Sequence, residues 1–211
     1  MDPDRPLTSF ADLAQRVRAG PARLGATRLV CIDGPAGSGK TTFAGRLVAA
    51  LGAGTAVVHM DDLYAGWTLD GAAARLTAGV LRPLAAGAPG SYSRYDWGAE
   101  RFADLLTVVP VPDVLVVEGC GSCPRALDAW TTLRIWVEAP ESVRLARGLA
   151  RDGDHLAGHW HRWLRSEAAE FAREDTRARA HLRVDGAADA PGDGFAVVPM
   201  SDPRGSAPSC Q

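Results

Sequence analysis

The stretch Gly34-Pro-Ala-Gly-Ser-Gly-Lys40-Thr41 decides the fold of this 211-residue chain. It fits the pattern G-x-x-x-x-G-K-[ST] of a phosphate-binding loop (P-loop), in which glycines let backbone N–H groups surround an anion. Lys40 is the only lysine, against twenty-two arginines, and its compact ammonium suits the β- and γ-phosphates of a nucleotide. We therefore expect these residues to bind nucleotide: Gly34, Pro35, Ala36, Gly37, Ser38, Gly39, Lys40, Thr41 and Thr42.

The segments on either side of the loop have the hydrophobic patterns that the motif requires. Residues 28–33 are a short apolar run that predicts a buried strand, and residues 42–51 carry apolar side chains at helical spacing. A strand, a glycine loop and a helix in this order direct a helix N-terminus at a phosphate group.

The rest of the chain alternates between strand-like apolar runs and amphipathic helical segments. We predict further strands at 55–60, 114–117, 132–137, 181–184 and 195–198, helices at 8–19, 69–84, 141–151 and 155–173, and a loop or short strand at 91–97. This alternation predicts an α/β fold of the P-loop NTPase class, a three-layer sandwich with a mainly parallel sheet and a helical lid at about 144–160. An N-terminal helix within residues 1–27 should pack on a domain of residues 28–200, and the polar composition of 201–211 indicates a disordered tail.

Composition narrows the range of partners. With 46% hydrophobic residues the chain can bury the core of one domain, and its net charge of −2 argues against nucleic acid as a partner. No apolar stretch reaches membrane-spanning length, and the first residues lack the pattern of a signal peptide. We expect a cytoplasmic protein that acts on a small molecule and leave open whether it forms a homo-oligomer.

Acidic residues follow two of the predicted strands. Asp61 and Asp62 come directly after the strand at 55–60, and Glu118 ends the strand at 114–117. Ligands bind at the carboxyl ends of strands in such sheets, so these carboxylates can reach a bound nucleotide and its metal ion. We predict Mg²⁺ near Thr41, Glu118 and Asp61, and we expect only one of the two adjacent aspartates to face the site.

Two further groups of residues allow two interpretations each. Arg144, Arg147 and Arg151 form either a solvated helix face or a lid that closes on the transferring phosphate. The segment Tyr92-Ser-Arg94-Tyr95-Asp96-Trp97 suits a flat polar substrate or an ordinary hairpin.

Cys120-Gly-Ser-Cys123 has no second cysteine pair, so we do not expect a zinc or redox site there.

Taken together, the P-loop, His59-Met-Asp-Asp-Leu-Tyr64, Val116-Val-Glu-Gly119 and the arginines of residues 144–151 resemble the uridine kinase family of P-loop nucleoside kinases, most closely its bacterial uridine kinase-like branch. The resemblance covers about residues 28–185. It implies that Lys40, Arg147 and Arg151 take part in catalysis with Asp61 as the catalytic base, and that Arg144 contacts the nucleotide. It also implies a substrate site made of Asp61, Tyr64, Tyr92, Arg94, Tyr95, Asp96 and Glu118.

These observations lead to an expected function. We expect a kinase that uses ATP and Mg²⁺ to phosphorylate a hydroxyl of a small molecule, with a nucleoside such as uridine or cytidine as the first candidate. A nucleoside monophosphate, a vitamin precursor or an antibiotic are alternative acceptors, and Arg75, Arg82, Arg94 and Arg101 could bind an acceptor phosphate. An ATP-hydrolysing assembly protein is a rival from another class. A common GTPase is excluded, because its [NT]-K-x-D motif needs a second lysine.

Overall fold

The computed structural model describes residues 7–190 and 192–199. Its centre is a five-stranded parallel sheet. The strands lie side by side in the order β3 (Thr55–His59), β6 (Val114–Glu118), β2 (Arg28–Asp33), β7 (Thr131–Glu138) and β8 (Leu182–Asp185). From β2 the chain first fills one side of the sheet with β3 and β6 and then the other side with β7 and β8. The P-loop therefore follows the strand at which the winding direction changes, which is where ligands bind in such sheets.

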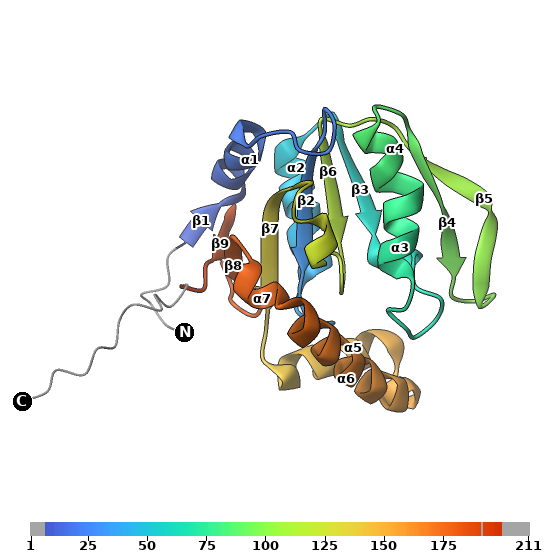
Figure 1. Ribbon diagram of the computed structural model, residues 1–211. Coiled ribbons are helices and arrows are strands. Elements are labelled where there is room, and N and C mark those ends of the chain that lie inside the picture. Colours follow the sequence, from blue (N-terminus) through green and yellow to red (C-terminus); the bar gives the residue numbers. More distant parts are fainter. Residues whose placement is uncertain (1–6, 191, 200–211) are drawn as a thin grey trace, which may run out of the picture.

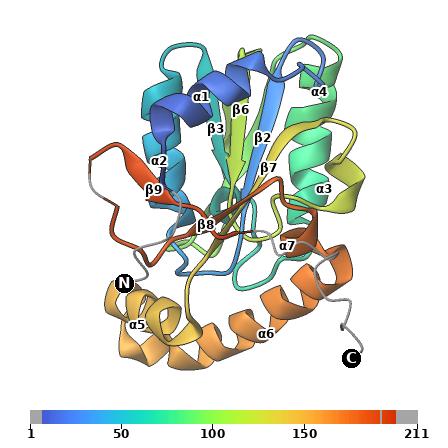
Figure 2. The same cartoon turned by 90° about the vertical axis from the view of Figure 1, so that its left-hand side faces the viewer.

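Helices cover both faces of this sheet, as the turned view shows (Figure 2). α1 (Phe10–Ala19) and α2 (Lys40–Leu51) pack on one face over a core that includes Phe10, Phe43 and Leu47. On the other face lie α3 (Ala72–Leu76) and α4 (Arg82–Ala85), joined by a π-helical turn (Thr77–Leu81). The predicted three-layer α/β sandwich is thus confirmed, although the helix expected at 69–84 starts later and is distorted by the π-turn.

The N-terminal helix is tied to the core by a cap and by a short sheet. The Ser9 hydroxyl accepts a hydrogen bond from the Asp12 backbone N–H at 3.0 Å, so Ser9 is the N-cap of α1. Just before it, β1 (Leu7–Ser9) pairs antiparallel with β9 (Gly194–Ala196). The sequence indicated a strand near β9 but gave no sign of β1, because three residues are too few to show a periodic pattern.

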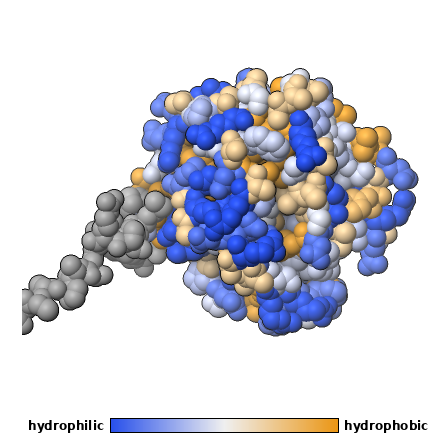
Figure 3. All heavy atoms as spheres, viewed as in Figure 1, coloured by the Kyte–Doolittle hydropathy of each residue, from blue (hydrophilic) through white to orange (hydrophobic). Residues whose placement is uncertain are grey.

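A two-stranded antiparallel hairpin stands apart from the main sheet. It consists of β4 (Gly90–Asp96) and β5 (Arg101–Val109), and it projects at the right-hand edge in Figure 1. Leu105, Leu106 and Val108 are exposed on β5, and Figure 3 shows apolar residues at this edge of the surface. The sequence suggested a short strand at 91–97 but missed β5.

The last helices cross the carboxyl ends of the strands, below the strand arrows in Figure 1. They are α5 (Glu141–Asp152), a 3-10 turn (Asp154–Leu156), α6 (Ala157–Glu174) and α7 (Thr176–Arg179). The expected lid at 144–160 thus comprises most of α5, the turn and the start of α6. Within the described ranges no helix is long and apolar enough to cross a membrane. The tail expected at 201–211 lies outside the described residues.

Candidate active site

The P-loop joins the carboxyl end of β2 to the first turn of α2. α2 begins at Lys40, and Gly39 has a φ of 100° in the left-handed region that favours glycine. A Cβ atom on Gly37 would collide with the backbone carbonyl of Arg144. The loop therefore packs tightly against α5 while its backbone and the N-terminus of α2 face a cavity, which is the arrangement that binds phosphate.

Lys40 is held inside this loop. Its Nζ donates a hydrogen bond to the Pro35 carbonyl at 2.9 Å and lies 3.5 Å from the Cys120 Sγ, and only 7% of the residue is exposed. Burial alone would lower the pKa of Lys40, but the thiol and three nearby carboxyl groups outweigh it, and the net direction is upward. The ammonium therefore stays charged at neutral pH, as a phosphate ligand must.

Thr41 and Glu118 meet beside the loop. The Thr41 Oγ1 lies 3.2 and 3.3 Å from the two carboxylate oxygens of Glu118. The Nδ1 of His59 lies 2.6 Å from Glu118 Oε1, and this hydrogen bond raises the pKa of His59. A hydroxyl and a carboxylate are the hard oxygen ligands that Mg²⁺ takes when phosphates and water complete its shell. Sequence reasoning did not assign a role to His59.

The two aspartates after β3 point to different surroundings. Asp61, in the 3-10 turn Met60–Asp62, lines the cavity, where solvent reaches it although protein surrounds it. Burial and the charge of Glu118 raise the pKa of Asp61. Asp62 is buried instead and accepts hydrogen bonds from the Tyr92 hydroxyl at 3.1 Å and from Arg94 Nε at 3.0 Å. The arrangement agrees with the expectation that one of the pair faces the site.

In the segment 92–97, which we predicted to contact substrate, some side chains line the cavity and others only support the surrounding structure. Tyr95 lines the cavity, whereas Tyr92 and Arg94 bind Asp62 and so hold the hairpin against the turn after β3. Asp96 accepts hydrogen bonds from two backbone N–H groups of its own turn, both at 2.9 Å. Tyr64 reaches the cavity wall but is fully buried, and its hydroxyl donates to a backbone carbonyl at 2.8 Å. The geometry thus gives Tyr92, Arg94 and Asp96 supporting positions in place of the expected contact with substrate.

The three arginines of α5 do not behave as one row. Arg144 is 9% exposed and its NH1 lies 3.0 Å from Glu167 Oε1, so it is neither part of a solvated face nor free to move with a lid. Arg147 is exposed and donates to the carbonyls of Gly37 at 3.3 Å and Gly186 at 3.0 Å. Arg151 is exposed, lines the cavity and pairs with its half-buried neighbour Asp152 at 2.7 Å. Arg147 and Arg151 remain the candidates for phosphate contact.

Two buried acids support the loop, and sequence reasoning assigned neither. Glu167 of α6 accepts from the backbone N–H of Ala36 at 2.8 Å and from Trp163 Nε1 at 3.0 Å, and burial raises its pKa. Asp33, at the end of β2, accepts from three backbone N–H groups, and burial raises its pKa to about 7. Asp33 could have been found by the strand-end rule that found Glu118. Glu167 lies in the middle of an amphipathic helix, where an acidic residue is common and does not indicate a functional site.

The cavity beside the loop has a volume of about 720 Å³ and two unlike ends. One end holds the Thr41 hydroxyl and the charged groups already described: Lys40, Asp61, Glu118, Arg147 and Arg151. The other end, called here the aromatic compartment, is lined by Trp67, Tyr95, Trp97, Trp160 and Trp163. Trp67 is its centre, with ring centroids 5.3 Å from the imidazole of His159, 5.9 Å from Trp97, 6.1 Å from Trp163 and 6.3 Å from Trp160. The sequence analysis did not single out Trp67.

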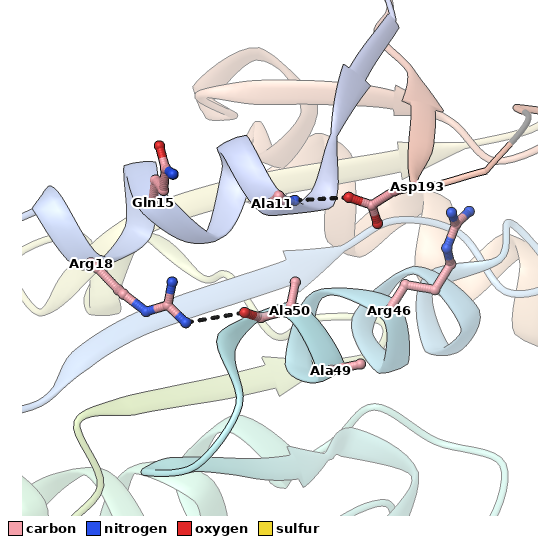
Figure 4. Close-up of a pocket in the computed structure, with 7 residues that line it drawn as sticks. All are labelled: Ala11, Gln15, Arg18, Arg46, Ala49, Ala50 and Asp193. Carbon is pink, nitrogen blue, oxygen red and sulfur yellow. Dashed lines mark hydrogen bonds between the residues drawn. The ribbon is translucent and has the colours of Figure 1, made fainter.

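A smaller hollow adjoins the loop on its other side. Its volume is about 340 Å³, and its walls include Gly39, Thr42, Arg147, Gly186 and Ala188. A third hollow of about 510 Å³ lies between α1 and α2, away from the loop (Figure 4). There the Arg18 guanidinium donates to the carbonyl oxygens of Ala50 at 3.0 Å and Leu51 at 2.7 Å, so its charge caps the end of α2.

The cysteines of the described residues are free and buried. Burial raises the pKa of Cys120, and a hydrogen bond with Cys31 together with burial raises that of Cys123. Thiols in this state are poor nucleophiles and poor metal ligands. Residues 7–190 and 192–199 contain no group of three or more His, Cys, Asp or Glu side chains that could hold a metal ion.

No protein-family model and no curated protein sequence matches this chain. Among solved structures, it is similar to a protein described as a possible uridine kinase from Bacillus stearothermophilus, at 20% identity and a TM-score of 0.61, over 82% of this chain and 96% of that one. It is also similar to a protein from Silicibacter sp. TM1040 proposed to be a fructose transport system kinase, at 23% identity and a TM-score of 0.54, over 77% and 95%. At these identities the similarity shows a shared fold.

Proposed function

We propose that this protein is an ATP- and Mg²⁺-dependent kinase of the uridine kinase-like type, which phosphorylates a hydroxyl group of a small molecule. The observation that supports it most is one cavity in which the P-loop lysine, a strand-end carboxylate and an aromatic compartment share the same space. Phosphoryl transfer needs a phosphate cradle, charge stabilisation and an acceptor held in line, and there is room here for all three.

The lining residues can be given roles in this reaction. Lys40 and the N-terminal amides of α2 bind the phosphates of ATP, and Asp61 orients the acceptor hydroxyl and accepts its proton. Thr41 and Glu118 would hold Mg²⁺, which neutralises charge on the phosphate oxygens when bound. Arg147 and Arg151 stabilise the charge of the transferring group, since both line the charged end of the cavity. Arg144 holds the loop through Glu167 rather than touching phosphate.

The hollow behind the loop is suited to the base of the nucleotide. It shares Gly39, Thr42 and Arg147 with the main cavity, so a nucleotide whose phosphates lie on the loop can extend into it. The segment that follows β8 forms one wall, including Gly186 and Ala188. This placement leaves the aromatic compartment free for the acceptor.

The surroundings of the acceptor site disfavour a phosphorylated acceptor. Of the arginines that could have bound an acceptor phosphate, Arg94 pairs with Asp62, Arg101 with Asp104, and Arg75 donates to backbone carbonyls. None of these three, nor Arg82, lines the cavity. A nucleoside or another small alcohol therefore fits the site better than a nucleoside monophosphate. An assembly ATPase would have no need of an aromatic compartment beside its P-loop.

The test is ADP release from Mg-ATP against a panel of nucleosides, nucleotides, vitamin precursors and other small alcohols. We expect ADP release that depends on one class of unphosphorylated alcohol and is lost in Lys40→Ala. Release stimulated only by nucleoside monophosphates would contradict the proposed acceptor class.

A further inference from the structure

The aromatic rings of the compartment are only partly covered by other parts of the protein. Trp67 and Tyr95 are half-buried and Trp97 is 43% exposed, so ring surface remains available to a ligand. The Trp67 and Trp97 rings meet at 74° and the Tyr95 and Trp97 rings at 81°. Nearly perpendicular aromatic walls can present ring faces to a ligand from more than one direction.

The charges around this compartment are unevenly distributed. The basic residues that line the cavity are Lys40, Arg147 and Arg151, and each belongs to its phosphate end or is already paired. Glu100, by contrast, lines the cavity from the turn between β4 and β5, and within the described residues its carboxylate forms no hydrogen bond or ion pair. The acceptor side therefore combines ring faces with an unpaired negative charge.

The turn that carries Glu100 is rigid and strained. Glu100 has a φ of 52°, a left-handed conformation that is uncommon for residues other than glycine. Asp96 fixes the turn through the backbone N–H groups of Gly98 and Ala99, and Trp97 Nε1 donates to the backbone carbonyl of Asp61 at 3.2 Å. The turn thus holds Trp97 and Glu100 at the cavity, and Trp97 joins it to the residue proposed as the base. A strained residue held in this way suggests a functional constraint.

Aromatic faces attract cations, and this wall already contacts one. The guanidinium carbon of Arg151 lies 5.9 Å from the centroid of the Trp160 ring. A ligand with a negative charge would face the unpaired Glu100 and would have to compete with Asp152 for Arg151, whereas a ligand with a positive charge would gain from both the rings and the carboxylate.

We propose that the acceptor is a hydroxyl-bearing molecule whose flat ring carries a positive charge, bound between Trp67, Tyr95 and Trp97 with its charge toward Glu100. The inference rests on the proposed kinase function for the role of the compartment, but the binding preference itself needs no nucleotide. It makes Glu100 a residue that determines acceptor specificity.

A pair of probes of matched shape tests this preference. One is 3-(hydroxymethyl)-1-methylpyridinium and the other is neutral 3-methylbenzyl alcohol, which differ mainly in the ring charge. Titrations of ¹⁵N-tryptophan-labelled protein, followed by NMR of the indole N–H signals, give both affinities without ATP. We expect the cation to bind about tenfold more tightly and to shift the Trp67 and Trp97 signals.

Two variants of the same hairpin complete the experiment. Glu100→Gln should reduce the preference for the cation by about threefold or more, because it removes the charge and keeps the shape. Asp104→Asn removes a carboxylate from β5 that is outside the cavity lining, so it should leave the preference unchanged. Equal or tighter binding of the neutral probe, no binding of either probe at millimolar concentration, or equal effects of the two variants would overturn the proposal. A cation preference without ADP release from any alcohol would refute the kinase function alone.

Discussion

Replacing Arg144 by alanine removes the cation of a buried ion pair that supports the P-loop. The guanidinium NH1 lies 3.0 Å from the carboxylate of Glu167 and also donates to the carbonyl of Ala36 at 3.3 Å. Only 2% of Glu167 is exposed. Glu167 in turn accepts the backbone N–H of Ala36. Loss of Arg144 therefore leaves the buried carboxylate without its ion-pair partner directly beneath the loop, with Lys40 as the remaining nearby cation.

The size of the effect follows from this burial. Removing one partner of a buried pair costs about 3–5 kcal/mol. Glu167 keeps its donors from Ala36, Trp163 and Cys120, and its raised pKa makes protonation easier, so we place the loss near the lower end, at about 3 kcal/mol. For a chain of this length that corresponds to a fall of about 6–12 °C in Tm.

Urea unfolding and calorimetry of the variant without ligands measure the loss. Arg151→Ala is the matched control, because Arg151 sits two turns further along α5 in an exposed pair with Asp152 and should cost at most about 1 kcal/mol. Combining Arg144→Met with Glu167→Met should recover much of the stability, since a buried pair can be replaced by apolar side chains. A loss below about 1 kcal/mol for Arg144→Ala, with an unchanged m-value, would refute the buried-pair account.

Four further predictions concern the site itself. Lys40→Arg should abolish activity although it keeps the charge, because the buried loop has no room for a planar fork; an active variant in an ADP-release assay would contradict this. Asp61→Asn should lower kcat by about a hundredfold or more with ATP affinity little changed. Asp62→Asn should mainly raise KM for the acceptor, because it loosens the hairpin. Steady-state kinetics that show the reverse pattern would exchange the roles of the two aspartates. Arg151→Ala should reduce kcat and kcat/KM for ATP by similar factors, and a wild-type kcat would remove it from the reaction. The pKa of His59 is raised, so its ion pair with Glu118 stabilises the fold fully below pH 6.5, and this contribution is lost as the pH rises through the raised value. Between pH 5.5 and 9, the Tm of His59→Gln should therefore fall less on the alkaline side than the Tm of the wild type. Parallel Tm curves for the two proteins would contradict this linkage.

The sequence predicted the fold well because its strongest signals are local. The P-loop pattern and the apolar runs at 28–33 and 114–117 mark the central strands β2 and β6 without reference to the rest of the chain. The rule that ligands bind at strand ends then located Asp61 and Glu118. Strand β5 was missed because its apolar residues do not alternate with polar ones: the consecutive Leu105 and Leu106 are both exposed, so no period-two pattern marks the strand.

The parts of the site that were missed depend on contacts between distant segments. Arg144 and Glu167 are 23 positions apart, and nothing in either local pattern shows that they pair beneath the loop. Trp67 stands alone in a connecting segment, and its importance appears only when the hairpin and α6 bring other rings to it. Tyr92 and Arg94 alternate with Tyr95 so as to suggest a substrate surface, yet their partner is Asp62.

The most direct measurement follows the fate of the γ-phosphate. With γ-labelled ATP, Mg²⁺ and the alcohol that gives the greatest ADP release, the label is divided between a phosphate ester and inorganic phosphate. We predict one ester formed per ADP, with both products lost in Lys40→Ala and strongly reduced in Asp61→Asn. Label recovered only as inorganic phosphate, at a rate independent of any alcohol, would contradict phosphoryl transfer and favour an ATP-hydrolysing protein.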